Sequence, residues 1–184
     1  MNTNEPASME VILINDRDEA IGTMEKIAAH RQALLHRAVS VFIFNEQGQW
    51  LLQRRNLEKY HSGGLWSNTC CTHPYPDESH REAACRRLRE EMGLACAIYP
   101  IFRFLYRAEL DHGLTEHELD TVFIGFTDDQ PQIDRSEVHE WKYLSSDQLA
   151  RHLKTVPHEY TVWFRQSFRK VERYLINGIH HDKN

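Results

Sequence analysis

Short apolar runs, some alternating with polar residues and some continuous, dominate the first third of the chain. This pattern is typical of β-strands buried on one face or on both. The predicted strands are Met9–Asn15, Ile21–Met24, Arg37–Asn45 and Trp50–Arg55. The polar stretches DRDE and NEQGQ between them favour two hairpins. Residues 25–36 are expected to form a loop with a helical turn.

The apolar spacing becomes helical in the centre of the chain. The stretch ESHREAACRRLREEMGL is rich in strong helix formers and ends at Gly93, which predicts a helix over Ser79–Met92. Further strands are predicted over Pro100–Leu110, Glu116–Thr127 and Glu137–Ser145, and further helices over Ser146–Lys154 and Tyr160–Asn177. The last helix is expected to stop at Gly178.

This order of elements favours an α+β fold over a doubly wound parallel sheet. The chain has 184 residues and is 41% hydrophobic, which is enough for one core and short for two. We therefore expect a disordered tail over residues 1–8, one domain over residues 9–178 and a short tail over residues 179–184. No repeat, low-complexity run or linker divides that domain.

Charge and cysteine content narrow the class of protein. A net charge of −5 argues against a broad nucleic-acid surface, which would be basic. No stretch approaches the ~18 apolar residues of a membrane-spanning helix, and no signal peptide is evident. The four cysteines have no regular spacing. We expect a cytoplasmic protein with free thiols, a small-molecule partner, no nucleic-acid or membrane partner, and a monomeric or weakly dimeric state.

The stretch NTCCTHPYP places two cysteines beside a histidine. Adjacent cysteines make a poor disulfide, and this spacing is unusual for a zinc site. If the segment is extended, Cys70 and Cys71 point to opposite faces, and His73 shares the face of Cys71. A thiol and an imidazole would then be presented together.

The helix over Ser79–Met92 carries Arg87 and Glu91 on one face, a pair that also suits a surface salt bridge. The segment resembles the Nudix box, matching it at Glu78, Arg86, Leu88, Glu90, Glu91, Gly93 and Leu94. Thr72 stands at the leading glycine of that box and Arg87 at a glutamate. The glutamates of a Nudix helix hold divalent ions, so this exchange removes a ligand and adds a cation. The helix is expected to bind a diphosphate without cutting it.

Other candidate metal ligands are spread along the chain. Glu116 and Glu118 are two apart on a predicted strand and so project from one face, although exposed acids often alternate in this way. His30 and His36 lie near each other, yet such pairs are more often surface or core residues. With His73, these residues would provide most of an octahedral shell for Mn²⁺ or Mg²⁺.

The motifs MEKIAAH, LLHRAVS, QRRNLEKY, LWSNTCCTHP, RRLREEMG, YRAEL and EHELD occur in this order. Over residues 9–163 they resemble the type I isopentenyl-diphosphate isomerases, which place a five-ligand metal site on a Nudix fold. The resemblance implies a Nudix-like α/β/α sandwich with a mixed or antiparallel sheet. It also implies a reaction that interconverts isopentenyl and dimethylallyl diphosphate through a tertiary carbocation.

The resemblance assigns roles residue by residue. The metal ligands would be His30, His36, His73, Glu116 and Glu118, holding one Mn²⁺, Mg²⁺ or Zn²⁺ ion. Cys71 and Glu118 would exchange protons with the substrate, Tyr106 would assist, and Trp163 would stabilise the cation. The diphosphate would be bound by Lys26, Arg55, Lys59, Arg87 and an Mg²⁺ ion held by Glu91.

Two other classes of function remain open at this point. A Nudix diphosphate hydrolase would use the same helix, but it has no need of Cys71 or of the paired histidines. A structural metal-binding or interaction protein would use the histidines alone. On periodicity alone, Trp163 also reads as part of the buried stripe of the last helix, and Tyr106 as an ordinary strand residue.

Overall fold

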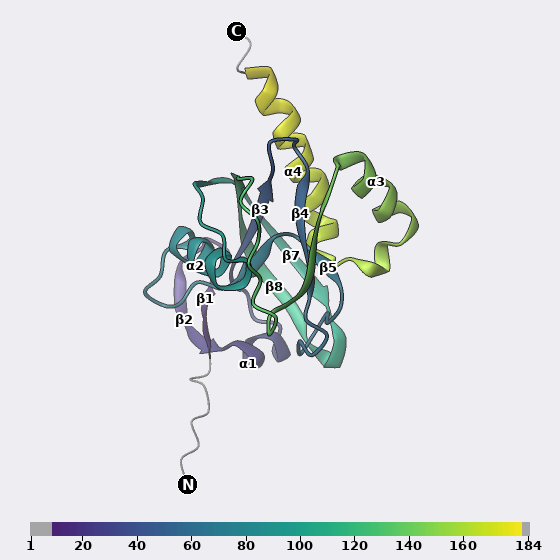
Figure 1. The fold of residues 1–184 in the computed structure, drawn as a ribbon. Helices are drawn as coiled ribbons and strands as arrows, with labels where there is room; N and C mark the ends of the chain where they lie inside the picture. Colours follow the sequence, from purple (N-terminus) through teal and green to yellow (C-terminus); the bar gives the residue numbers. More distant parts are fainter. Residues whose placement is uncertain (1–8, 182–184) are drawn as a thin grey trace.

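A mixed sheet of nine strands is the centre of the described residues (Figure 1). The structure is a computed structural model that describes residues 9–181, with side chains described over residues 9–177. The strands are β1 Glu10–Ile14, β2 Ala20–Glu25, β3 His36–Phe44, β4 Trp50–Arg55, β5 Trp66–Ser67, β6 Cys70–Thr72, β7 Ile98–Glu109, β8 Thr115–Phe126 and β9 Val138–Leu144. The helices are α1 Lys26–Arg31, α2 His80–Met92, α3 Ser146–Thr155 and α4 Val162–His181, with 3-10 turns at Asp111–Gly113 and Pro157–Glu159.

Strand β3 organises the sheet. One of its edges pairs in parallel with β8 along its whole length, and β1, β6 and β4 share the other edge in antiparallel pairings. Eight of its nine residues are buried, as expected for a strand covered on both faces. The register sets His36 opposite Glu118 and Ser40 opposite Cys71. Positions that are remote in sequence therefore become neighbours.

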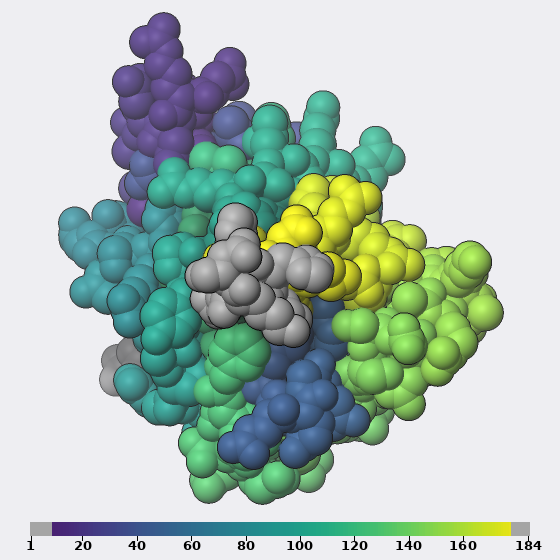
Figure 2. All heavy atoms as spheres, turned by 90° about the horizontal axis from the view of Figure 1, so that it is seen from above, coloured from purple at the N-terminus to yellow at the C-terminus, as the bar shows by residue number. Residues whose placement is uncertain are grey.

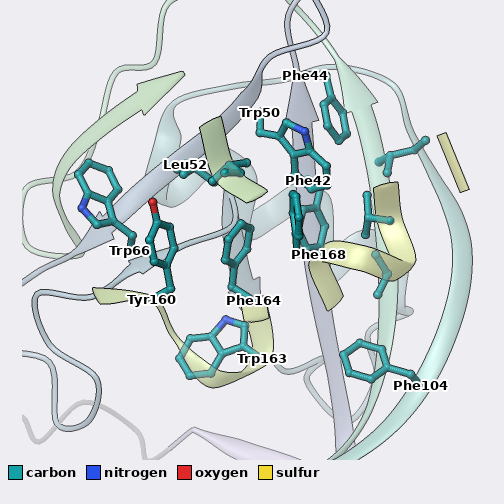
Figure 3. Close-up of a cluster of buried hydrophobic side chains, with 14 of the residues drawn as sticks. Phe42, Phe44, Trp50, Leu52, Trp66, Phe104, Tyr160, Trp163, Phe164 and Phe168 are labelled. Carbon is teal, nitrogen blue, oxygen red and sulfur yellow. The ribbon is translucent and has the colours of Figure 1, made fainter. Parts of the chain in front are cut away.

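Helices cover both faces of this sheet. Helix α2 packs through Ala84 and Leu88 against Val41 and the other side chains on one face. On the opposite face, Phe42 of β3 packs against α4 in an aromatic cluster (Figure 3). Viewed from above, the region of α2 (teal) and helix α3 (yellow-green) lie on opposite sides of the molecule, with α4 between them (Figure 2). The arrangement is the predicted α/β/α sandwich with a mixed sheet.

The local signals at the ends of α2 explain why its prediction is confirmed. Ser79 and Glu82 form a reciprocal capping box, and Gly93 ends the helix in the left-handed region at φ 65°. The helix predicted to stop at Gly178 instead continues to His181, so that boundary was wrong. The expected disorder of residues 1–8, and residues 182–184 of the expected tail, lie outside the described residues.

Two short strands, β5 and β6, were missed because neither is long enough to show a period of two. They exist through their partners: β5 pairs with β4, and β6 pairs with β3. The predicted helical turn before His36 is confirmed as α1. Over residues 9–181, no helix combines the length and the apolar character needed to cross a membrane.

Candidate active site

Three histidines meet at the base of one pocket, although they come from α1, β3 and the segment after β6. His30 and His36 are fully buried, and His73 is nearly so. The Nδ1 atoms of His30 and His36 lie 2.7 Å from the backbone carbonyl oxygens of Lys26 and Leu34. Because a carbonyl can only accept, these Nδ1 atoms carry the protons, and each Nε2 keeps a lone pair for the cluster.

Glu118 of β8 completes this group of donors. Its Oε1 lies 3.0 Å from Nε2 of His73, 3.4 Å from that of His36 and 3.9 Å from that of His30. All four donor atoms lie within 4.8 Å of one another. Neighbouring ligands at ~2.1 Å from an octahedral ion are ~3 Å apart. The separations suit one divalent ion.

The hydrogen bonding of the cluster also fits an ion. The Nε2 atoms of His36 and His73 face each other at 3.3 Å, and the buried Nε2 of His30 has no hydrogen-bond partner. Burial lowers the pKa of His30 and lowers that of His73 to about 3, so both rings are neutral near pH 7. Buried polar atoms are normally paired, and an ion would satisfy these lone pairs.

Tyr106 of β7 links the two carboxylates of β8. It lies opposite Glu118 in the sheet, and its hydroxyl is 2.5 Å from Oε2 of Glu118 and 3.0 Å from Oε2 of Glu116. Burial and the Glu118 carboxylate raise the pKa of Glu116 well above its usual value. Glu116 is not part of the four-donor group; it lies within 4.8 Å of donor atoms of His30 and His61 instead.

Cys71 faces the same pocket from β6, while Cys70 is buried in the core on the other side of the strand. The Cys71 thiol donates to Oδ1 of Asn68 at 3.1 Å and lies 3.6 Å from Oγ of Ser40. Burial and the nearby Asp120 carboxylate raise the pKa of the thiol far above its ordinary value. The thiol is therefore protonated at neutral pH and is in the form that can donate a proton.

Four cations line the pocket: Lys26, Arg55, Lys59 and Arg87. Burial, followed by repulsion from Lys59, Arg55 and Arg87, lowers the pKa of Lys26 to about 8. Four cations gathered at one end of a pocket suit an anionic ligand.

Two carboxylates lie among these cations. Glu91 of α2 accepts from Nε2 of Gln53 at 2.6 Å, and its Oε1 lies 2.7 Å from Nη2 of Arg87. Glu137, which precedes β9, pairs with both Lys59 and Arg87. Each acid is thus paired with at least one of these cations.

Trp163 forms part of the pocket wall and is also buried in the aromatic core, where it is 3% exposed (Figure 3). Its place in the buried stripe of the last helix is confirmed, and its role towards a cation stays a prediction. Its Nε1 donates to Oγ of Ser67 at 2.9 Å, which fixes the plane of the ring. The guanidinium carbon of Arg55 lies 5.2 Å from the ring centroid.

The pocket brings together the thirteen residues singled out in the sequence, with His30 and His36 beneath it and the other eleven on its walls. Sequence reasoning missed His61, Ser40, Asp120 and Glu137. Ser40 and Asp120 each lie two or more residues from any predicted site residue, and Oγ of Ser40 donates to Oδ2 of Asp120 at 2.6 Å. No spacing rule connects them to Cys71; only the strand pairing does.

Comparisons with known proteins show the family of the chain. The NUDIX domain family matches residues 34–167. A protein of Pectobacterium atrosepticum named isopentenyl-diphosphate Delta-isomerase is 51% identical over 165 residues, covering 90% of this chain and 92% of that protein. A Burkholderia multivorans protein with the same name is 46% identical, covering 84% of this chain and 88% of its own.

Solved structures show the same fold at low identity. The Deinococcus radiodurans protein DR0079 superposes with a TM-score of 0.72 at 20% identity, covering 88% of this chain and 98% of that one. A MutT protein of Methanosarcina mazei gives a TM-score of 0.61 at 24% identity, covering 76% and 94%. The chain thus belongs to the NUDIX domain family and, within it, to the isopentenyl-diphosphate Delta-isomerases.

Proposed function

We propose that this chain interconverts isopentenyl diphosphate and dimethylallyl diphosphate. One observation carries the proposal: a protonated thiol, a carboxylate held by imidazoles and a tyrosine, and four cations line a single pocket. The first two groups suit proton transfer to and from carbon, and the cations suit a diphosphate. The relatives at 51% and 46% identity are named for this isomerisation.

The double bond moves when one carbon gains a proton and another loses one. In one direction Cys71 donates its proton to the terminal CH₂ carbon, which leaves a tertiary carbocation. Glu118 then removes a proton from the carbon adjacent to the CH₂ group that bears the diphosphate, and Tyr106, bonded to that carboxylate, carries the proton onward. One proton enters and one leaves, so atoms and charge balance. A bound divalent ion would stabilise the negative charge of the carboxylate.

The carbocation needs a wall that stabilises it and excludes water. The indole face of Trp163 can contribute ~2 kcal/mol towards a desolvated cation. Its hydrogen bond to Ser67 holds the ring in place, so the face is already oriented before substrate enters. Water reaching the cation would convert it to an alcohol, so water has to be kept from the cation while it exists.

Lys26, Arg55, Lys59 and Arg87 bind the diphosphate in this proposal, and Glu91 would hold an Mg²⁺ ion that offsets its negative charge. The donors of His30, His36, His73 and Glu118 would hold a second divalent ion, Mn²⁺, Mg²⁺ or Zn²⁺, since mixed nitrogen and oxygen donors suit these ions. Arg87 occupies the position where a hydrolytic Nudix helix carries a glutamate. This exchange favours binding over hydrolysis.

The assay that tests the proposal separates isomerase from hydrolase. The chain is loaded with Mn²⁺ and Mg²⁺, incubated with isopentenyl diphosphate, and analysed for dimethylallyl diphosphate and for released phosphate. We expect the isomer without phosphate, loss of activity after chelation, and recovery when the ions return. Release of phosphate as the main product would instead favour the hydrolase.

The pKa of Lys26 predicts how substrate affinity changes with pH. In the free protein Lys26 loses its proton near pH 8, while the diphosphate prefers the protonated ammonium and so raises this pKa in the complex. The KM for isopentenyl diphosphate is therefore expected to be low below pH 8 and to rise as pH increases through 8.

Lys26→Arg provides the matched comparison, because arginine stays charged throughout this range. The variant should lose most of the rise in KM between pH 7 and pH 9.5. The same steep rise in Lys26→Arg would show that another group titrates. Steady-state kinetics over this pH range, with each ion held in excess, measure the effect.

A further inference from the structure

His61 lies in the loop between β4 and β5 and is buried in the pocket wall, with no function assigned above. Its ring stacks on that of His30 at 6.1 Å between centroids and meets the ring of Trp163 edge-on at 5.9 Å. It is 5% exposed. Its described polar contact is between Nδ1 and Oγ of Ser62, at 3.2 Å. Its other ring nitrogen, Nε2, makes no hydrogen bond to the described residues, so its lone pair can serve a ligand.

The loop holds this ring in place. The carbonyl of His61 accepts from Nη2 of Arg55 at 3.2 Å, and the backbone N–H of Ser62 donates to Oδ2 of Asp111 at 3.3 Å. Ser62 adopts a left-handed φ of 51°, and a Cβ on Gly63 would lie 2.6 Å from the carbonyl oxygen of Leu57. The left-handed Ser62, the close approach at Gly63 and these hydrogen bonds allow the loop little freedom. The loop conformation therefore fixes the orientation of the His61 ring.

A second group of metal donors includes this ring. Ligand atoms of His30, His61 and Glu116 all lie within 4.8 Å of one another, and all three residues are buried. The Glu116 carboxylate accepts from Tyr106 and retains lone pairs for an ion. Two imidazoles and a carboxylate are a common ligand set for transition ions.

The two groups share His30 and cannot be filled independently. Nδ1 of His30 is occupied by the carbonyl of Lys26, which leaves one lone pair, on Nε2. One lone pair binds one ion. An ion bound to His30 therefore has two sets of further donors within reach, His36, His73 and Glu118 in one group and His61 and Glu116 in the other.

We propose that His61 is a ligand of the divalent ion of this site, on the side where it adjoins Glu116. This inference rests on the metal site of the proposed function. A fourth imidazole makes the site richer in nitrogen, which favours Zn²⁺ or Co²⁺ over Mg²⁺. It also places a ligand between the ion and the Trp163 wall.

Zinc titration followed by nitrogen NMR tests the proposal without an activity assay. The full chain, labelled with ¹⁵N in its histidine rings and stripped of metal, receives Zn²⁺ alone. When a ring nitrogen binds zinc, its ¹⁵N chemical shift changes strongly from the value in the metal-free protein. We expect His61 to shift at the same zinc-to-protein ratio as His30, His36 and His73. His139, an exposed histidine of β9, should not move.

Two variants add an affinity readout. His61→Ala should weaken Zn²⁺ binding at least ~10-fold in a competition with a chelator, as loss of a metal-supporting group does. It should also lower the ratio of the affinity for Zn²⁺ to the affinity for Mg²⁺. His139→Ala should leave both unchanged. Circular dichroism and a melting curve of each metal-free variant test folding, and His61→Gln serves if His61→Ala does not fold.

The outcomes distinguish failure of the His61 proposal from failure of the metal site in the proposed function. If His30, His36 and His73 shift with zinc while His61 stays in place, His61 is a packing residue and the inference is overturned. If none of these rings shifts, the metal site itself fails. If His61→Ala binds Zn²⁺ as tightly as the parent chain, the inference is again overturned, whatever the NMR of the parent shows.

Discussion

Replacing Cys71 by alanine is expected to reduce turnover by ~10²–10⁴-fold, the range contributed by a positioned general acid. The thiol is the protonated group that faces the pocket from β6, oriented by its hydrogen bond to Asn68. Its raised pKa keeps it in the donor form, and alanine offers no proton to the alkene. The measurement is kcat for isopentenyl diphosphate under saturating ions, together with KM, which should change little.

Cys85→Ala is the matched control, since Cys85 is a half-buried thiol of α2 that lies outside the pocket. It should retain nearly full activity. Zn²⁺ affinity and the melting curve of Cys71→Ala should match those of the parent chain, because Cys71 is not a member of either donor group. Near-normal turnover in Cys71→Ala would remove the thiol from the mechanism.

Glu118→Gln is expected to weaken ion binding and to remove the base that takes the proton from carbon. Its Oε1 lies among the donor atoms of His30, His36 and His73, and its Oε2 contacts the Tyr106 hydroxyl. A neutral amide is a weak ligand and a poor base, so ion affinity should fall by at least ~10-fold and kcat by ~10²–10⁴-fold. Isothermal titration with Mn²⁺ measures the first effect, and turnover at an ion concentration that saturates the variant measures the second.

The comparison at saturating ion separates the two roles. If turnover recovers fully once the ion site of Glu118→Gln is filled, the carboxylate only binds metal, and the base lies elsewhere. Glu109→Gln, an exposed change on the neighbouring strand β7, should alter neither quantity. Tyr106→Phe removes the hydroxyl alone, so it should lower kcat while leaving the ion bound.

The predictability of each part of the site depended on whether its residues are close in sequence. The pair Arg87 and Glu91 could be placed on one helical face because four residues span about one turn. The opposite orientations of Cys70 and Cys71 followed from the alternation of a strand and are confirmed by the core and the pocket. Such local geometry depends only on the backbone of one element.

His61, Glu137 and Ser40 could not be found in this way, whereas Asp120, two residues after Glu118 on β8, shares the face of Glu118 by the same alternation. Ser40 meets Cys71 because β6 pairs with β3, and Asp120 joins them because β8 lies on the other edge of β3. Glu137 reaches Lys59 across a span of 78 residues. These contacts depend on strand register and on loop conformation, neither of which leaves a periodic signal.

The sequence by itself determined the class of fold, the diphosphate helix and the list of groups able to do the chemistry, since period, caps and motif spacing are properties of short segments. The tertiary structure decided which of those groups share a pocket. It set His36 opposite Glu118, divided the donors into two groups that share His30, and brought in His61. Strand pairing and loop packing between distant segments position these atoms, and so the grouping of the ligands was settled only in the folded chain.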